Sequence, residues 1–466
     1  MDRLADVGLA DGDGAAPRVS ARAIVVGAGW SGLAAALALV DAGAEVALLD
    51  AAPQAGGRAR RVEVALGDRR YALDNGQHLL IGAYVQTLRL LRRLGVDPTR
   101  AFERVPFTLR YPDGFALRAA SWPAPLHLAA ALLRARRCGT RERLALATWV
   151  ASMRRARWRI EPDRPAAELF RGHPDRLVDR IWQPLCVAAL NVRLQQASAA
   201  MFLAVLRDSL GADAAASDLL LPRGDLSGLL PDAAVDALEV GATVRLRTPV
   251  VGLRRLAPRG WAVQTRGGAP IAADAVVLAL PPSRAADLLV SIDGAPCADA
   301  VAMLRRIETA PIATVYLRYP EALRLPHPVY ALREDPATER YGQWVFDRGA
   351  LDANCGGVLA VVISADGPHL ERDRDAVVAA VARQLSADLG LPAPLAAALL
   401  IEKHATIVPA PGLQRPPARL AAPGLYLAGD AAASPYPSTI EGSVRAGLTA
   451  AGALRADLEL SSRAAR

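Results

Sequence analysis

The 466-residue sequence has a single lysine, Lys403, and few cysteines, and both shortages narrow its function. The other 54 of its 55 basic residues are arginine. A bias this complete is typical of genome-wide composition, so we do not take the net charge of +8 as a sign of nucleic-acid binding. The cysteines lie far apart with no CxxC pair, which argues against a metal site or a disulfide framework. We expect four buried free thiols in a cytoplasmic protein, at Cys138, Cys186, Cys297 and Cys355.

The sequence also has no visible internal repeat or low-complexity linker, and we do not expect a secretory leader. Residues 1–20 carry acids and small residues without an apolar core, so we expect a flexible tail rather than a signal. Hydrophobic residues make up 52% and charged residues 22%, a balance that excludes extensive disorder and predicts a large core. This length is typical of two or three domains.

The longest uncharged run, residues 23–40, has the length of a membrane span but not its pattern. A β-branched segment at 23–26 leads into a glycine turn at 27–32, and an Ala/Leu-rich helix follows to residue 40. A second strand at 44–49 ends at an acid. The segment therefore predicts a βαβ unit.

The glycine turn of this unit has the spacing of a dinucleotide-binding loop. Gly27 permits the tight turn, Gly29 lets the backbone approach a pyrophosphate, and Gly32 lets helix and strand pack closely. The free N–H groups at the start of the helix, where Ser31 lies, would hold the phosphate charge. Asp50, eighteen residues after Gly32, would accept a hydrogen bond from a ribose 2′-OH.

Two further motifs accompany the loop. Gly56-Gly57-Arg58 follows directly, and its guanidinium would reach the same pyrophosphate. Near the other end of the chain, residues 424–430 form a short strand ending in Gly429-Asp430, and residues 438–443 open a long Ala-rich helix. The dinucleotide domain is therefore expected to close from both ends of the chain.

In these three motifs the sequence resembles the flavin amine oxidase and phytoene desaturase superfamily, over residues 21–455. The resemblance implies FAD as cofactor, with Asp430 on its ribityl or pyrophosphate side. It also implies that the backbone of Ile440 lies near the isoalloxazine ring and that the backbone of Val250 caps the adenosine. The implied fold class is α/β, a Rossmann-like FAD-binding domain of the amine oxidase type with a discontinuous α+β substrate domain.

The resemblance and the placement of the motifs give a domain division. Residues 21–95, 222–290 and 400–458 are assigned to the FAD-binding domain, and residues 96–221 and 291–399 to the substrate domain. Strands are predicted at 312–319 and 357–364 and a helix at 375–389.

A narrower resemblance lies in residues 74–84 and 402–406, which look like the hydroxysqualene dehydroxylase branch of this superfamily. His404 replaces the usual Arg of that segment and Ile407 a usual Phe. The resemblance implies reduction of the triterpene alcohol hydroxysqualene to squalene by hydride from reduced FAD, in squalene and hopanoid biosynthesis. No separate NAD-binding unit is visible, so an external electron donor is expected to reduce the flavin.

Four residues are candidates for chemistry or for a structural role. In relatives the loop that matches residues 74–78 approaches the flavin, so Gly76 and Gln77 join the cofactor-binding set. His78 either protonates the departing hydroxyl or hydrogen-bonds FAD or backbone. Asp74 either orients His78 or caps the loop. Lys403 lies either near flavin N5 or at the surface. Glu441 either meets the flavin pyrimidine edge or caps a helix.

Residues 121–164 contain ten arginines against three acids, interleaved with Trp122, Trp149 and Trp158. Such basic amphipathic helices form either a membrane-surface contact or a solvated face over an ordinary core. The first alternative predicts peripheral association with the inner face of the membrane. Apolar helical stretches at 181–186 and 197–206 line a lipid tunnel or pack in the core.

Two other function classes stay open. The same flavin pocket serves a polyene desaturase or an amine oxidase, although residues 434–437 offer one aromatic where amine oxidases usually build a pair. The third class is a non-catalytic lipid-binding protein, since GDP-dissociation inhibitors of Rab proteins share this fold. The presence of all three FAD motifs disfavours that class.

Overall fold

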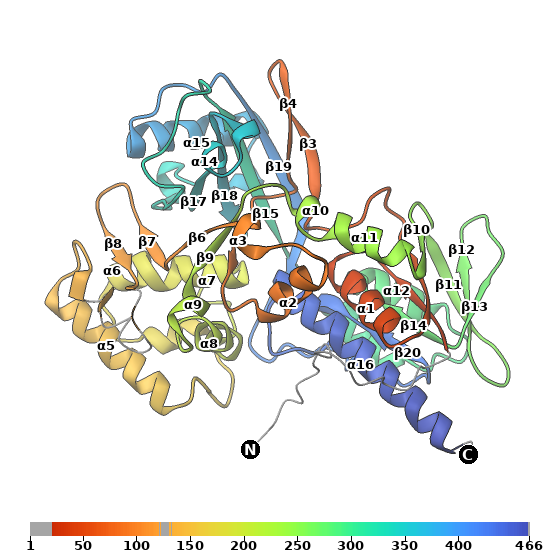
Figure 1. The fold of residues 1–466 in the computed structure, drawn as a ribbon. Helices are drawn as coiled ribbons and strands as arrows, with labels where there is room; N and C mark the ends of the chain where they lie inside the picture. Colours follow the sequence, from red (N-terminus) through yellow and green to blue (C-terminus); the bar gives the residue numbers. More distant parts are fainter. Residues whose placement is uncertain (1–20, 121, 123–129, 132, 465–466) are drawn as a thin grey trace.

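The computed structural model describes residues 21–120, 122, 130–131 and 133–464. It is built around two large sheets, with a helical layer beside the second (Figure 1). The tail predicted for residues 1–20 lies outside the described residues, as do residues 121, 123–129 and 132 of the predicted basic segment.

The first sheet is wholly parallel and has the order β10-β2-β1-β14-β20. Its core follows from strand alternation, because Ala23 and Val25 pack under α1 and α16 while Ile24 and Val26 face α12 and a small antiparallel sheet. Its strands are β1 (Arg22–Val26), β2 (Glu45–Leu49), β10 (Ala242–Arg245), β14 (Ala275–Leu278) and β20 (Leu425–Leu427). The covering elements are α1 (Trp30–Asp41), α11 (Pro231–Glu239), α12 (Pro282–Val290), α13 (Ala298–Arg305), α16 (Ile440–Ala464), β11 (Val250–Arg255), β12 (Trp261–Thr265) and β13 (Ile271–Ala273).

The second sheet is antiparallel and has the order β16-β17-β18-β15-β19. One face packs on α15, and the other packs toward the helical layer. Its strands are β15 (Thr309–Arg318), β16 (Val329–Ala331), β17 (Trp344–Asp347), β18 (Val358–Ser364) and β19 (Ala396–Ile407), with α14 (Arg348–Leu351) and α15 (Arg374–Leu389) beside them.

The helical layer is held together by stacked aromatic rings. Phe170 and Trp182 lie parallel at 4.5 Å, and Trp149 contacts both. Its helices are α5 (Thr140–Arg155), α6 (Asp175–Leu177), a π-helical turn Val178–Trp182, α7 (Gln183–Leu190), α8 (Ala199–Asp208) and α9 (Ala214–Ser217).

Short elements join these layers. They are β3 (Arg61–Leu66), β4 (Arg69–Asp74), β5 (Leu80–Ile81), α2 (Val85–Arg93), α3 (Pro98–Ala101), β6 (Phe102–Val105), β7 (Thr108–Arg110), β8 (Ala116–Arg118), β9 (Leu219–Pro222) and α10 (Leu226–Leu229).

The predicted elements are confirmed. The uncharged run at 23–40 folds as β1, a loop and α1, and the strands and helix predicted at 312–319, 357–364 and 375–389 appear as β15, β18 and α15. Within the described part of the chain, no helix has the length and apolarity needed to cross a membrane. The domain division remains a proposal, and its expected crossing near residue 400 falls inside β19.

Candidate active site

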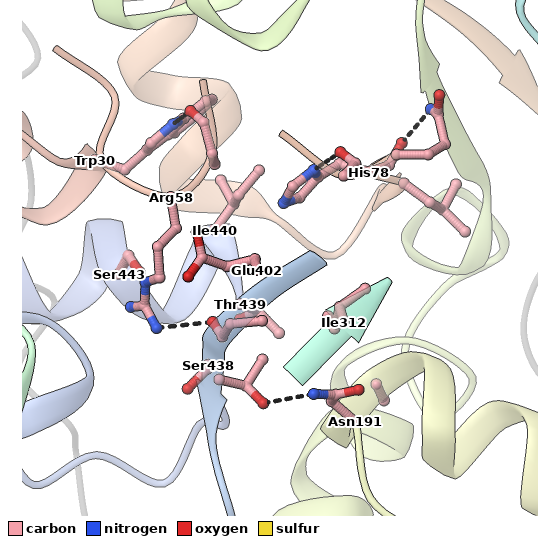
Figure 2. A pocket seen from close by; sticks show the side chains of 18 of the residues that line it. Trp30, Arg58, His78, Asn191, Ile312, Glu402, Ser438, Thr439, Ile440 and Ser443 are labelled. Carbon is pink, nitrogen blue, oxygen red and sulfur yellow. Dashed lines mark hydrogen bonds between the residues drawn. The ribbon is translucent and has the colours of Figure 1, made fainter. Parts of the chain in front are cut away.

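A cavity of about 950 Å³ lies at the carboxyl ends of the parallel strands and extends between the second sheet and the helical layer (Figure 2). In open parallel sheets, ligands bind at this edge, at the point where the strand order reverses. The volume is at the upper end of the roughly 300–1,000 Å³ of ligand pockets. One part of the lining is rich in glycine and charge, and the other part is apolar.

In the loop after β1, the surroundings of the three glycines are consistent with the role predicted for each of them. Gly27 has φ +108°, and a Cβ there would lie 2.3 Å from the Ala279 carbonyl oxygen. A Cβ on Gly32 would lie 1.8 Å from the Gly27 carbonyl oxygen, so this glycine serves packing and does not line the cavity. A Cβ on Gly29 would meet no protein atom closer than 3.8 Å, which leaves the backbone open to a ligand.

The start of α1 offers unused hydrogen-bonding groups to the cavity wall. The helix has no side-chain cap and no acid in its first turn, so its first N–H groups are free for an anion. The Ser31 hydroxyl is buried with no hydrogen-bond partner among the described residues. At the end of β2, the Asp50 carboxylate is fixed by the backbone N–H groups of Ala28 and Ala52, at 2.5 and 2.7 Å.

Arg58 joins three distant segments at the cavity edge. Gly56 pairs with Gly29, so the second glycine pair lies directly against the first loop. From there the Arg58 guanidinium donates to Asp430 Oδ2 at 2.5 Å and to the Ala405 carbonyl oxygen at 2.7 Å. The motifs predicted from opposite ends of the chain therefore meet. Gly57, Gly429 and Asp430 all line the cavity, and so does Ile440 at the start of α16.

These groups fit a dinucleotide. The free helix N-terminus and Arg58 suit a pyrophosphate, the open Gly29 backbone allows close approach, and the Asp50 carboxylate suits a ribose hydroxyl. Val250 begins β11 and does not line the cavity. The segment just before Val250 nevertheless lies beside Asp50, because Thr248 donates its backbone N–H to the Asp50 carbonyl oxygen.

His78 projects into the cavity from the loop after β4 (Figure 2). Its Nδ1 lies 2.6 Å from the Gly76 carbonyl oxygen, which only accepts, so Nδ1 carries the proton. Neutral His78 therefore presents a bare Nε2. Burial lowers the pKa of His78, as does the charge of Arg58, while the hydrogen bond to Gly76 raises it. Gln77, beside it, donates Nε2–H to the His78 carbonyl oxygen, and both Gly76 and Gln77 line the cavity.

Asp74 does not contact the His78 imidazole and does not line the cavity. Its Oδ1 accepts from the Leu226 N–H at the start of α10, and its carbonyl oxygen accepts from the Tyr316 hydroxyl. Burial raises the pKa of Asp74 to about 7, against the opposing charge of Arg348. Of the two alternatives for Asp74, the structure supports capping, although of α10 rather than of its own loop.

Glu402 and Lys403 lie on opposite sides of β19, because successive strand residues alternate. Glu402 lines the cavity and accepts from Asn75 Nδ2 at 3.0 Å, whereas Lys403 is exposed and is not part of the lining. The prediction of a catalytic Lys403 is therefore not supported by its position. Sequence reasoning missed Glu402, and simple alternation would not have identified the lining of this strand, because a register shift opposite residues 402–406 leaves His404 exposed.

Glu441 caps a helix other than its own. Its fully buried carboxylate accepts from the backbone N–H groups of Gln86 and Thr87, in the first turn of α2, and from Arg445. The contacts with Gln86 and Thr87 hold α16 against α2, whereas Arg445 lies one turn further along α16 itself. Glu441 does not line the cavity, so the structure supports the capping alternative over a contact with flavin.

The apolar part of the cavity is formed by α7, α8 and the inner face of the second sheet. Asn191, at the end of α7, fixes this corner by donating to Thr406 and the Pro311 carbonyl oxygen (Figure 2). The helices predicted near 181–186 and 197–206 do line the cavity. The apolar lining includes Leu185, Val187, Phe202, Val205, Leu206, Ile312, Trp344, Phe346 and Val362.

Comparison with known proteins agrees with this geometry. Residues 30–455 match the family described as flavin containing amine oxidoreductase. The chain belongs to the flavin-containing amine oxidoreductase family. It is an FAD-dependent oxidoreductase, and the cavity motifs are those that the resemblance predicted.

The curated relatives narrow the comparison. The chain is 30% identical to the hydroxysqualene dehydroxylases of Sinorhizobium fredii (strain NBRC 101917 / NGR234) and Rhodopseudomonas palustris (strain ATCC BAA-98 / CGA009). Each match covers 92% of this chain and 96% of the relative. A probable zeta-carotene desaturase of Synechococcus elongatus is 28% identical over 52% of the chain and 53% of its own length.

Solved structures share the fold at low identity. Cyclohexylamine oxidase from Brevibacterium oxydans IH-35A superposes with a TM-score of 0.66 at 18% identity, covering 94% of this chain and all of that one. A putative protoporphyrinogen oxidase from Exiguobacterium sp. 255-15 gives 0.65 at 18% identity, covering 94% and 99%. These family members confirm the predicted α/β fold.

Proposed function

We propose that the chain is a hydroxysqualene dehydroxylase, which reduces hydroxysqualene to squalene for hopanoid synthesis. The observation that carries this proposal is the cavity itself, in which a dinucleotide cradle continues into an apolar wall built by α7, α8 and the second sheet. A hydrocarbon chain with one hydroxyl suits such a wall. The names of the curated relatives support the same substrate.

The cofactor set of the proposal follows the contacts of the cradle. Asp50 would hold the ribose, while Arg58 and the start of α1 would hold the pyrophosphate. When bound and reduced, FAD supplies a hydride to the substrate carbon. The remaining proposed contacts come from the three motifs and from the loop before His78, and their residues line the cavity: Gly27, Gly29, Ser31, Gly57, Gly76, Gln77, Gly429, Asp430 and Ile440. Gly32 and Val250, which were also predicted, do not line it, so no direct contact is proposed for them.

The reaction balances with one hydride and one proton. The allylic C–O bond breaks, the hydroxyl leaves as water after protonation, and a C–H bond forms. Two electrons pass to the substrate, and an external donor restores them. An allylic cation is reactive toward water, so the apolar wall would exclude water while the charge develops.

His78 is the proposed proton donor. Because Nδ1 is held by Gly76, a second proton would be taken up at Nε2 of this cavity-lining imidazole. The lowered pKa makes the imidazolium scarce and strongly acidic, which favours transfer to a leaving hydroxyl. Glu402 acts as a positioning residue, since it holds Asn75 at the base of the same loop.

A polyene desaturase is the second candidate, and the partial match to a carotene desaturase favours it over an amine oxidase. Tyr436, the aromatic residue of the 434–437 segment, has the Arg445 guanidinium over its ring at 4.3 Å. The non-catalytic lipid-binding alternative has no need for the FAD cradle, and purification of a protein without flavin would favour it.

The proposed function is tested by asking whether the enzyme consumes only an allylic alcohol or also a saturated one. Dithionite-reduced enzyme is given hydroxysqualene or its fully hydrogenated analogue, and products are identified by mass spectrometry. Squalene from the first and no product from the second would support the proposal, because only the allylic alcohol gives a stabilised cation. Equal consumption of both alcohols would contradict it.

A further inference from the structure

The outer face of α5 and the residues beside it carry arginines that no acid balances. Between residues 130 and 160 the one acid is Glu142, which accepts from the Gly139 N–H at 2.6 Å and is largely buried. The nearby ion pairs use Arg164, Arg171 and Arg176 instead. Between residues 130 and 160, the described arginines that are exposed and have no ion pair are Arg134, Arg136, Arg137, Arg141, Arg154, Arg155, Arg157 and Arg159.

Large apolar side chains are exposed on the same face. Leu133 is 73% exposed, Leu144 66% and Trp122 48%. The Arg134 guanidinium lies over the Trp122 ring at 5.4 Å, and Arg143 ties Leu133 to α5 by donating to its carbonyl oxygen. Trp149 and Trp158, by contrast, are buried. The sequence-based amphipathic interpretation is thus corrected in detail, because these two rings serve the core.

The hairpin β7–β8 adds a second group of cations at this end of the molecule (Figure 1). Ala116 of β8 pairs with Arg136, which brings Arg110 and Arg118 of the hairpin near it. Burial lowers the pKa of Arg110, and the charges of Arg118 and Arg136 lower it further. Burial also lowers the pKa of His327, and the charges of Arg110 and Arg118 lower it further. Asp113, in the turn of the hairpin, pairs with Arg180 at 2.6 Å, so among the described residues the cations at this end outnumber the acids.

We propose that this arginine-rich face, formed by Trp122, residues 133–159 and the β7–β8 hairpin, docks on an anionic phospholipid bilayer. Unpaired arginines would contact lipid phosphates, while Trp122, Leu133 and Leu144 would enter the headgroup region. Exposed leucines favour a bilayer over a nucleic acid, whose backbone offers them no apolar partner.

The docking face is rigidly connected to the cavity. Trp149, on the buried side of α5, lies 4.4 Å from the Trp182 ring, and Phe170 stacks on Trp182. Phe170 also contacts Phe202 of α8, which lines the cavity. Docking would thus hold the apolar wall beside the membrane, where a water-insoluble substrate resides. This benefit rests on the proposed function, whereas the docking itself does not.

The test is co-sedimentation with vesicles, using the FAD-loaded full-length protein. Vesicles of phosphatidylcholine with one-quarter phosphatidylglycerol are compared with pure phosphatidylcholine. The variant R154Q/R155Q/R157Q is compared with R254Q/R259Q/R266Q, which removes the same charge from exposed arginines of the β11–β13 sheet. At about fivefold for each arginine near the surface, the first variant should bind anionic vesicles roughly 100-fold more weakly than wild type. The second variant should bind within about twofold of wild type.

Several outcomes would overturn the inference. Equal weakening of vesicle binding by the two triple variants would mean that only net charge matters. Failure of the wild-type protein to sediment with anionic vesicles would show that the face does not bind them. Protection of the face by an oligonucleotide but not by vesicles, measured by hydrogen exchange, would assign it to nucleic acid. A second variant, L133S/L144S, should weaken binding at high salt, where the arginines are screened. Turnover of detergent-dispersed substrate tests the proposed function separately, since it needs no membrane.

Discussion

Replacing His78 with glutamine removes the imidazole that is proposed to protonate the substrate hydroxyl. The glutamine side chain retains hydrogen-bonding capacity but cannot transfer a proton. An imidazole with the ordinary pKa of 6.5 is about one-quarter protonated at pH 7, and burial makes His78 less so. General acid catalysis contributes about 10²–10⁴-fold. The small population of imidazolium places the expected loss at the lower end, roughly 100-fold at pH 7.

The assay is a single turnover under anaerobic conditions, in which squalene formation by pre-reduced enzyme is followed from about pH 5.5 to 8. Because the pKa of His78 is lowered, the acid form is still gaining population below pH 6.5, so the wild-type rate should keep rising as the pH falls. The His78→Gln rate should be nearly flat. FAD content should match wild type, and His404→Gln serves as a matched control because His404 is exposed and does not line the cavity. A variant with the wild-type rate and the same pH profile would refute the assignment.

Three other changes test neighbouring parts of the account. Glu402→Ala should slow turnover about tenfold and Glu402→Gln should restore most of it, since the amide still accepts from Asn75; failure of the glutamine variant to recover would argue against positioning. Gly29→Val should purify without FAD and have nearly the Tm of wild-type protein stripped of FAD, whereas Gly27→Ala should lower Tm by several degrees because its Cβ would clash with Ala279; FAD in the Gly29 variant would contradict the cradle. The pKa of Asp74 is raised to about 7, so the folded state binds the extra proton and wild-type stability falls as pH rises from about 4 to 7. The Tm difference between Asp74→Asn and wild type should therefore shift in favour of the variant across this range, and a constant difference would exclude the raised pKa.

Local sequence was sufficient for the cofactor half of the site. The βαβ unit at residues 22–49 needs only short-range pattern and glycine chemistry, and each glycine has the geometry expected from its position. The motif resemblance implied that Arg58 and Asp430 both lie beside the cofactor, but it did not predict the hydrogen bond between them, which spans 372 residues.

The catalytic half depended on tertiary contacts that the sequence does not display. Lys403 drew attention as the only lysine, yet the strand that carries it turns Glu402 inward instead. Glu441 had the position of a first-turn acid of its own helix, and only packing of α16 on α2 reveals which N–H groups it caps. Trp149 and Trp158 looked like membrane anchors because their partners, Phe170 and Trp182, come from a segment whose packing the periodicity does not specify.

The direction of electron flow is the central claim, and one half-reaction tests it most directly. Enzyme is reduced with dithionite under anaerobic conditions, freed of excess reductant and mixed with hydroxysqualene. The account predicts that the yellow absorbance of oxidised flavin returns with one squalene formed per FAD. Flavin that stays reduced with hydroxysqualene, while the oxidised enzyme is bleached by a polyene precursor or an amine, would contradict the account and identify an oxidase or desaturase.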